Sequence, residues 1–285
     1  MRDAPCPCLI CTSAPRNGDA GIVKTVEEHG WCALAVPGTY DFAFTVGLRH
    51  SFNLPEIAMF GLVGEDMQQW LNTCVARVRA DGWPAAEAPL AGVIDGIAVQ
   101  LRPIDASWSD AFFGSLHRFY RGHPEPVWQL LWSDAAGRWP WDEQATQSSR
   151  LRQPWAWLPA AEHPDGSWRL LYEYADGFTL PAEPDAWALT SRAVAAGERA
   201  PALVVFDGGA FDVLDDRGHD ADDLCVAYLG HLVRRHPTLA ALGDLPDGIT
   251  ARATGGGWKR AALEEPLRHA SAAAWERGGI TQLRG

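Results

Sequence analysis

Three cysteines at the start of the chain are the residues whose chemistry is easiest to name. Cys6, Cys8 and Cys11 lie within six positions of one another. Thiolates spaced this closely can hold a soft metal such as zinc, and His29 or Cys32 is the expected fourth ligand. The alternative is a mobile N-terminal tail that carries reducible thiols. The sequence therefore predicts a possible zinc site at Cys6, Cys8 and Cys11.

Two histidines are candidates for proton transfer. His50 follows an apolar strand that ends at Gly47, and Arg49 precedes it directly. At that position an imidazole can act as acid, base or metal ligand, and Arg49 can pair with a carboxylate or phosphate of a ligand. His117 lies near the apolar side of an expected helix, next to arginine and tyrosine donors. The alternatives are a solvated surface turn for His50 and a hydrogen-bonded core histidine for His117.

A tryptophan-rich stretch is the third candidate. The chain has 14 tryptophans, and six of them lie between positions 128 and 157. An expected strand carries Gln129 and Trp132, and Trp139 and Trp141 follow on either side of a proline. Indoles stack on planar ligands and cations, while an amide reads the polar edge of a ligand. The alternative is a tightly packed plug of tryptophans, in which Asp134 only caps its own turn.

Composition excludes several classes of protein. The chain has 285 residues and a net charge of −12, and both halves carry more acids than bases. The chain has no excess of basic residues, so nucleic-acid binding is not expected. It also has no apolar run long enough to span a membrane. The beginning of the chain lacks the pattern of a secretory signal, and the six cysteines are too sparse for a disulfide scaffold, so we expect a cytoplasmic protein. Phosphate loops, dinucleotide glycine motifs and serine-hydrolase elbows are absent from the sequence.

Strand and helix patterns alternate along the whole chain. The periodicity predicts strands over 31–36, 40–48, 56–63, 96–104, 127–132, 168–173, 186–190, 202–206 and 210–214. It predicts helices over 65–81, 109–120, 220–235 and 263–276. The pattern breaks near Leu158 and Pro159, where we place a domain boundary. The expectation is an α+β protein of two compact domains, 1–158 and 159–285, each a mixed or antiparallel sheet with packed helices.

Residues 1–158 resemble a bacterial family known as a domain of unknown function. The segments that carry the resemblance are Cys8–Cys11, His29–Trp31, Phe44–Leu48, Pro55–Glu56, Phe60–Leu62 and Gln129–Asp134, followed by Gly137, Pro140 and Trp141. Phe44 stands where members often have tyrosine, and Ser133 where they often have proline. The resemblance implies a compact bacterial domain and supplies no activity or catalytic residue.

The second half is similar to a companion module that often follows that domain, and it resembles immunity-type binding modules. The resembling segments are Leu189–Val194, Val204–Asp207 and Gly257–Trp258, with Phe211 in place of an expected tryptophan. The resemblance implies a binding protein.

The leading expectation is a protein that binds a small anionic or planar ligand, or a partner protein, through a first-domain pocket. That pocket is framed by Arg49, His50, His117, Gln129, Trp132, Trp139 and Trp141. One alternative is an enzyme that uses His50 and His117 for acid–base chemistry on a small nucleotide-like substrate. The other is an immunity protein whose acidic surface masks a basic toxin.

Overall fold

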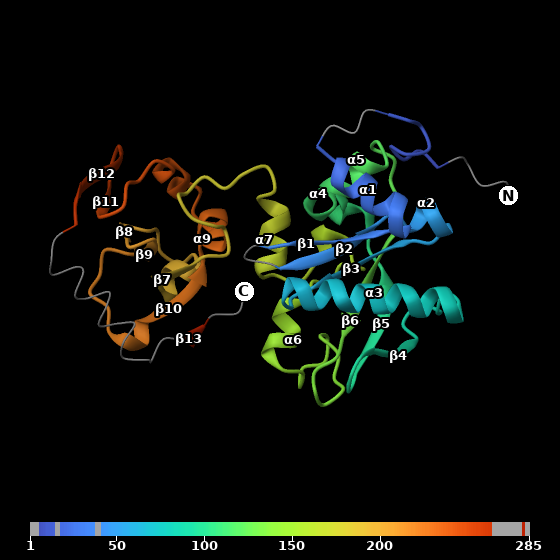
Figure 1. The fold of residues 1–285 in the computed structure, drawn as a ribbon. Coiled ribbons are helices and arrows are strands. Elements are labelled where there is room, and N and C mark those ends of the chain that lie inside the picture. The colour runs from blue at the N-terminus through green and yellow to red at the C-terminus, as the bar shows by residue number, and fades with distance from the viewer. Residues whose placement is uncertain (1–5, 15–17, 38–40, 264–280, 283–285) are drawn as a thin grey trace. The chain divides into compact units, whose positions relative to one another are not determined.

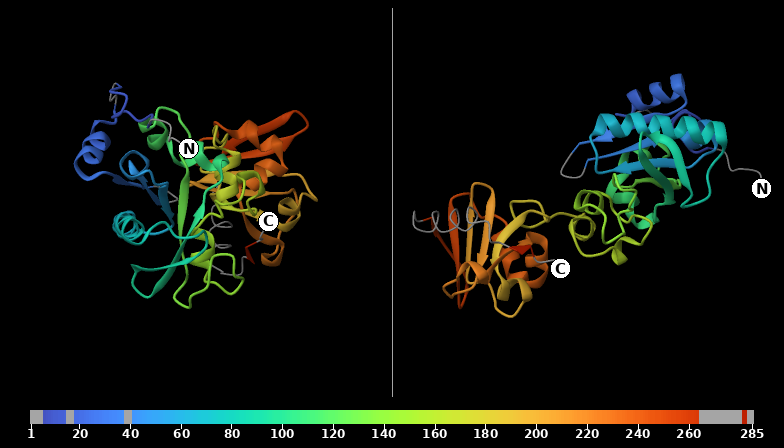
Figure 2. Two further views of the ribbon diagram at one scale, coloured as in Figure 1. Left: turned by 90° about the vertical axis from the view of Figure 1, so that its right-hand side faces the viewer. Right: turned by 90° about the horizontal axis from the view of Figure 1, so that it is seen from below.

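The computed structural model describes residues 6–14, 18–37, 41–263 and 281–282. The chain divides into two compact units, 1–163 and 164–285, each with its own sheet (Figures 1 and 2). Helices and sheets occur together in both units, which confirms the predicted α+β class. None of the helices in the described part of the chain combines the length and apolar character that crossing a membrane requires.

The first unit is built on a six-stranded mixed sheet in the order β1-β2-β3-β6-β5-β4. The strands are β1 (Cys32–Val36), β2 (Phe42–Val46), β3 (Glu56–Phe60), β4 (Pro89–Ile94), β5 (Ile97–Pro103) and β6 (Val127–Trp132). All neighbours are antiparallel except the central pair β3 and β6, which run parallel with Glu56 opposite Val127. The helical elements are α1 (Ala20–His29), α2 (Leu48–Phe52), α3 (Gly64–Asp81), η1 (Ala106–Trp108), α4 (Ser109–Phe112), α5 (Gly114–Phe119), α6 (Gln147–Arg152) and η2 (Ala160–Glu162).

Both faces of this sheet are covered. Successive residues of a strand point to opposite faces of the sheet and so belong to two separate cores. On one face, α3 packs its buried side chains against the sheet; these are Met67, Leu71, Cys74, Val75 and Val78. On the other face, an aromatic cluster joins the sheet to α4 and the elements beside it, with Phe42 and Phe60 of the sheet against Phe112. Strands β2 and β3 are buried along their whole length, as expected for central strands covered on both sides.

The second unit is built on a seven-stranded mixed sheet in the order β12-β11-β8-β9-β7-β10-β13. The strands are β7 (Trp187–Ser191), β8 (Leu203–Asp207), β9 (Ala210–Leu214), β10 (Leu224–Tyr228), β11 (Ile249–Thr254), β12 (Gly257–Ala262) and β13 (Thr281–Gln282). The helical elements are α7 (Ser167–Glu173), α8 (Arg192–Ala196), η3 (Ala221–Asp223), α9 (Leu229–Arg235) and η4 (Pro237–Leu242). Leucines of α9 and η4 pack with the buried residues of β8, β9 and β11 into one core.

Several predicted elements differ from the structure. Residues 168–173 form helix α7 instead of a strand, because a short apolar run does not distinguish the two by periodicity. The helix predicted over 220–235 is three elements, since 224–228 pair with β7 as strand β10 and only 229–235 are α-helical. The helix predicted over 109–120 is two helices separated at Phe113. The helix predicted over 263–276 falls almost entirely outside the described residues.

Candidate metal centre

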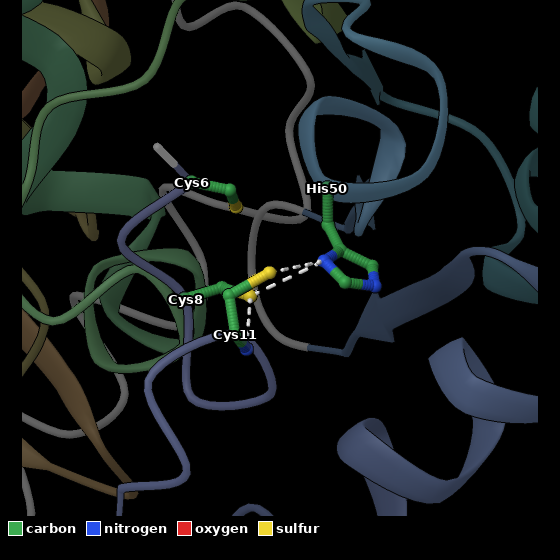
Figure 3. A group of neighbouring side chains, drawn as sticks. All are labelled: Cys6, Cys8, Cys11 and His50. Atoms are coloured by element: carbon green, nitrogen blue, oxygen red, sulfur yellow. Dashed lines mark hydrogen bonds between the residues drawn. The ribbon is translucent and has the colours of Figure 1, made fainter. Parts of the chain in front are cut away.

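Four side chains from two distant segments meet at one point in the first unit. The thiols of Cys6, Cys8 and Cys11 and the imidazole of His50 place their ligand atoms within 4.8 Å of one another (Figure 3). His50 Nδ1 lies 3.3 Å from the Sγ atoms of both Cys8 and Cys11. In a tetrahedral zinc site, bonds of about 2.3 Å to sulfur and about 2.1 Å to nitrogen place those two ligand atoms about 3.6 Å apart. The observed spacing is therefore close to that of an assembled Cys3His site.

A tight turn gathers the cysteines. The Cys8 carbonyl accepts hydrogen bonds from the main-chain N–H of Thr12 at 3.1 Å and from its hydroxyl at 2.8 Å. The Cys11 N–H donates to the Cys8 sulfur at 3.4 Å, an interaction that stabilises a thiolate. The Leu9 N–H donates to the Phe119 carbonyl at 2.9 Å and so fastens the turn to the end of α5. Local hydrogen bonds thus hold the thiols on one side of the turn.

Helix α2 presents the histidine. The helix begins after Gly47, whose φ of 110° is a conformation that other residues rarely adopt. A Cβ atom at this position would lie 2.9 Å from the Val26 side chain and 3.0 Å from the Gly30 carbonyl. The main chain therefore passes close to α1, and it turns from β2 directly into the helix that carries His50. His50 thus lies half-buried in a short helix directly after β2, and not in the open surface turn of the alternative interpretation.

The buried carboxylate of Glu56 holds the start of this helix through hydrogen bonds. Glu56 is fully buried at the start of β3 and accepts hydrogen bonds from four donors. These are the Thr45 hydroxyl at 2.6 Å, the Tyr120 hydroxyl at 2.7 Å, the Gly47 N–H at 2.9 Å and the Arg49 N–H at 3.3 Å. Burial raises the pKa of Glu56, and the four donors oppose that rise. The sequence analysis did not identify Glu56 or Tyr120 as functional residues. A single acid at the start of an apolar strand is a signal that points to Glu56.

Burial keeps three of the four side chains in their neutral forms when no ion is bound. Burial raises the pKa of Cys6 to about 12 and also raises that of Cys11, so without a metal these thiols keep their protons at neutral pH. Burial lowers the pKa of His50, which keeps its imidazole neutral and able to donate a lone pair. A divalent cation reverses the preference of the thiols, because a coordinating thiol is deprotonated outright.

The predicted fourth ligands are wrong. His50 takes the place that the sequence assigned to His29 or Cys32. The His29 side chain is 68% exposed and lies 3.9 Å from Glu28. Cys32 belongs to β1 and lies outside the group. The fourth ligand depends on where α2 packs, which spacing along the chain does not reveal.

Arg49 and His117 have polar partners within the first unit. Arg49 lies 3.5 Å from Glu125, so its cation already has a carboxylate partner. His117 Nε2 lies 2.7 Å from the Ser109 hydroxyl, and its Nδ1 lies 3.5 Å from Asp110. His117 thus bonds within the η1–α5 region and does not belong to the cysteine group.

Gln129 and Trp132 are buried in β6, and each donates a hydrogen bond inside the unit, while Gln129 Oε1 is buried without a hydrogen-bond partner among the described residues. Gln129 Nε2 donates to the Pro154 carbonyl at 2.9 Å, and Trp132 Nε1 donates to the Phe60 carbonyl at 3.0 Å. Asp134 caps its own turn, as the alternative interpretation expected, by accepting from the N–H groups of Ala136 and Arg138. These residues hold the domain together in the observed arrangement.

Trp139 and Trp141 belong to a group of four half-buried indoles, which we call the tryptophan strip. It consists of Trp139, Trp141, Trp155 and Trp157. Trp139 and Trp141 stack in parallel with ring centroids 5.5 Å apart. The Arg102 guanidinium lies 4.1 Å from the ring centroid of Trp141 and 4.5 Å from that of Trp157. The guanidinium of Arg102 thus already covers part of the tryptophan strip.

The first unit is therefore an α+β domain with a Cys3His group beside its second helix. Residues 25–146 match the model of a family described as a domain of unknown function (DUF4262), which confirms the predicted resemblance. The matched range includes His50 and begins after the three cysteines. Searches of curated proteins and of solved structures found no match.

Proposed function

We propose that the first unit is a zinc-binding domain, in which Cys6, Cys8, Cys11 and His50 hold one ion with a structural role. The convergence of these four ligand atoms within 4.8 Å is the observation that carries the proposal. Four protein ligands fill all the positions of a tetrahedral site, whereas a catalytic zinc keeps one position open for water or substrate. Sulfur and imidazole ligands favour zinc over magnesium or calcium.

The structural role follows from what the ion would join. The cysteines precede α1, while His50 belongs to α2, which Glu56 and Tyr120 connect to the central sheet. A bound ion would fix the N-terminal turn to this helix and add its binding free energy to the folded state. Cysteines that form no disulfide are usual in a reducing compartment, which supports the expected cytoplasmic location.

Elemental analysis of the purified full chain tests the proposal. We expect one zinc per chain for the unmodified protein and a loss of zinc in Cys8→Ser. Cys32→Ser is the matched control, since Cys32 lies outside the group, and it should retain the metal. Cobalt exchanged into the site should give the visible absorption typical of a tetrahedral thiolate centre.

A chain without zinc, cobalt or another thiophilic metal after purification under reducing conditions would overturn the proposal. The same holds if Cys8→Ser and Cys32→Ser lose metal equally, because the bound ion would then not depend on this group. Circular dichroism of both variants shows whether either substitution has unfolded the chain.

A second candidate function is the binding of a planar anionic ligand at the tryptophan strip. The supporting observation is that all four stacked or edge-packed indoles keep part of their surface exposed, where a planar ligand can reach them. Flavin mononucleotide is a suitable probe, because it is planar and anionic. Saturable quenching of tryptophan fluorescence that is lost in Trp139→Ala supports this function, and the absence of saturable quenching rules it out for this ligand class.

A further inference from the structure

The three thiols of the candidate metal centre differ in their access to solvent. Cys8 is buried, Cys6 is half-buried and Cys11 is exposed. An oxidant dissolved in water therefore reaches the Cys11 sulfur first, because oxidation of a cysteine depends on its thiolate character and its exposure. Cys74 and Cys225 are fully buried, so the same oxidant does not reach them.

The turn brings the Cys8 sulfur next to Cys11. The Cys8 carbonyl accepts from the Thr12 N–H, as in one turn of a helix, where side chains three positions apart are neighbours. Both sulfurs lie 3.3 Å from the same atom, His50 Nδ1 (Figure 3). The Cys11 N–H also donates to the Cys8 sulfur at 3.4 Å, so that sulfur lies against the residue with the exposed thiol. Because all ligand atoms lie within 4.8 Å of one another, the two sulfurs reach the bonding distance of about 2 Å after a small movement.

We propose that Cys8 and Cys11 form a peroxide-sensitive pair, in which a disulfide between them expels the zinc ion that the four ligands hold. The inference rests on the proposed zinc site and adds a modification that regulates it. Cys11 provides the accessible sulfur, and Cys8 provides the second thiolate within reach. The zinc ion keeps both sulfurs deprotonated, and the thiolate is the form that reacts.

The reaction with hydrogen peroxide balances in two steps. The Cys11 thiolate attacks one peroxide oxygen, the O–O bond breaks, and hydroxide leaves a sulfenic acid on Cys11. The Cys8 thiolate then attacks the Cys11 sulfur, the S–S bond forms, and the S–O bond breaks with the loss of a second hydroxide. The two thiolates thus give up two electrons, which reduce one peroxide to two hydroxides, and protons from solvent convert these to water.

The disulfide leaves too few ligands for the ion. Cys6 and His50 remain, whereas a structural zinc ion takes four protein ligands. Without the ion, the N-terminal turn loses its connection to α2 and keeps the bond of 2.9 Å from the Leu9 N–H to the Phe119 carbonyl. A dithiol reductant returns the two electrons to the sulfurs, after which zinc binds again.

Treatment of the zinc-loaded full chain with a small excess of hydrogen peroxide tests the proposal. We expect complete release of zinc, followed with a chromophoric chelator, at the rate at which the disulfide forms. Alkylation of the remaining thiols and digestion with trypsin give the peptide of residues 3–16, in which Cys6 alone should be alkylated. Cys32→Ser is the matched control and should release zinc at the same rate, since Cys32 lies outside the group. A dithiol followed by added zinc should restore the metal content.

Elemental analysis before oxidation separates this inference from the proposed function. A chain that contains no thiophilic metal overturns both, whereas a zinc-loaded chain that keeps its ion in peroxide overturns only the peroxide-sensitive pair. Zinc release that leaves Cys8 or Cys11 alkylated overturns the pair as well, because the disulfide would then lie elsewhere. The same holds for a release that no reductant reverses, and for oxidation of Cys74 or Cys225 before Cys11.

Discussion

The phenol oxygen of Tyr120 donates a hydrogen bond of 2.7 Å to Glu56 and accepts one of 3.3 Å from the main-chain N–H of His50. One side chain at the end of α5 thus connects the buried carboxylate of β3 to the helix that carries the candidate metal ligand. Glu56 also holds the first turn of that helix through the N–H groups of Gly47 and Arg49. The position of His50 therefore depends on the buried carboxylate of Glu56 and on the Tyr120 hydroxyl.

Replacing Glu56 should strongly destabilise the first unit. Glu56→Ala leaves a cavity and four donors without their acceptor, and the expected loss is at least about 3 kcal/mol of unfolding free energy. Glu56→Gln keeps the shape and one carbonyl oxygen, so its loss should be smaller. Urea unfolding measures both, with the exposed Glu65→Ala as the control. Equal stabilities of Glu56→Ala and the control would show that the carboxylate contributes nothing.

Asp134 should make stability depend on pH in the acid range. Burial alone would raise its pKa, but bonds from Arg138, Thr146 and Ala136 lower it to about 2. Because this pKa lies below the unfolded value of about 3.9, the stabilisation is complete above about pH 4 and is lost as the pH falls toward 2. The difference in unfolding free energy between the unmodified chain and Asp134→Asn should therefore shrink over that window. A difference that stays constant from pH 5 to 2.5 contradicts the assignment.

Removing the metal should loosen the N-terminal turn and leave the second unit unchanged. The Leu9 N–H bonds to the Phe119 carbonyl, and without the ion this bond is one of few that hold the turn. We expect faster hydrogen exchange at the Leu9 amide after treatment with a zinc chelator. The Leu229 amide, which bonds to the Ala186 carbonyl in the second unit, is the internal control. Unchanged exchange at Leu9 would mean that the ion does not hold the turn.

His117→Ala should affect stability without affecting metal content. The substitution removes the bond of 2.7 Å to the Ser109 hydroxyl, and a neutral hydrogen bond contributes about 1 kcal/mol. His50→Ala, in contrast, should lose zinc. Thermal unfolding and elemental analysis of the two variants separate the roles of the two histidines. Loss of zinc from His117→Ala to the same extent would show that His117 takes part in the metal centre.

Sequence patterns predicted the elements whose periodicity is set locally. Helix α3 was expected over 65–81 and occupies Gly64–Asp81, because its apolar residues recur on one face. Strands β3 and β6 were likewise expected close to their observed positions. Residues 224–228 were assigned to a helix, since nothing local shows that β7 lies alongside them to pair with. Whether such a segment forms a strand or a helix depends on which distant strand it pairs with.

The candidate site was likewise predictable only in its local part, the cysteine turn. Three closely spaced thiols pointed to the turn of the candidate metal centre, because spacing of a few residues is a local property. His50 as their partner was not predictable, since it requires the turn at Gly47 and the packing of α2 against α1. The interactions of Gln129 and Trp132 with Pro154 and Phe60 likewise come from distant parts of the fold.

The parallel pairing of β3 with β6 has a consequence for how this protein is made. Glu56 lies opposite Val127, and a long stretch that includes α3 and the β4–β5 hairpin separates them. On the ribosome, β3 must therefore wait with one side unpaired until β6 has been synthesised and has left the exit tunnel. Contacts between residues so far apart in sequence form slowly. The apolar strand β3 thus stays open to pairing with other chains until β6 has emerged.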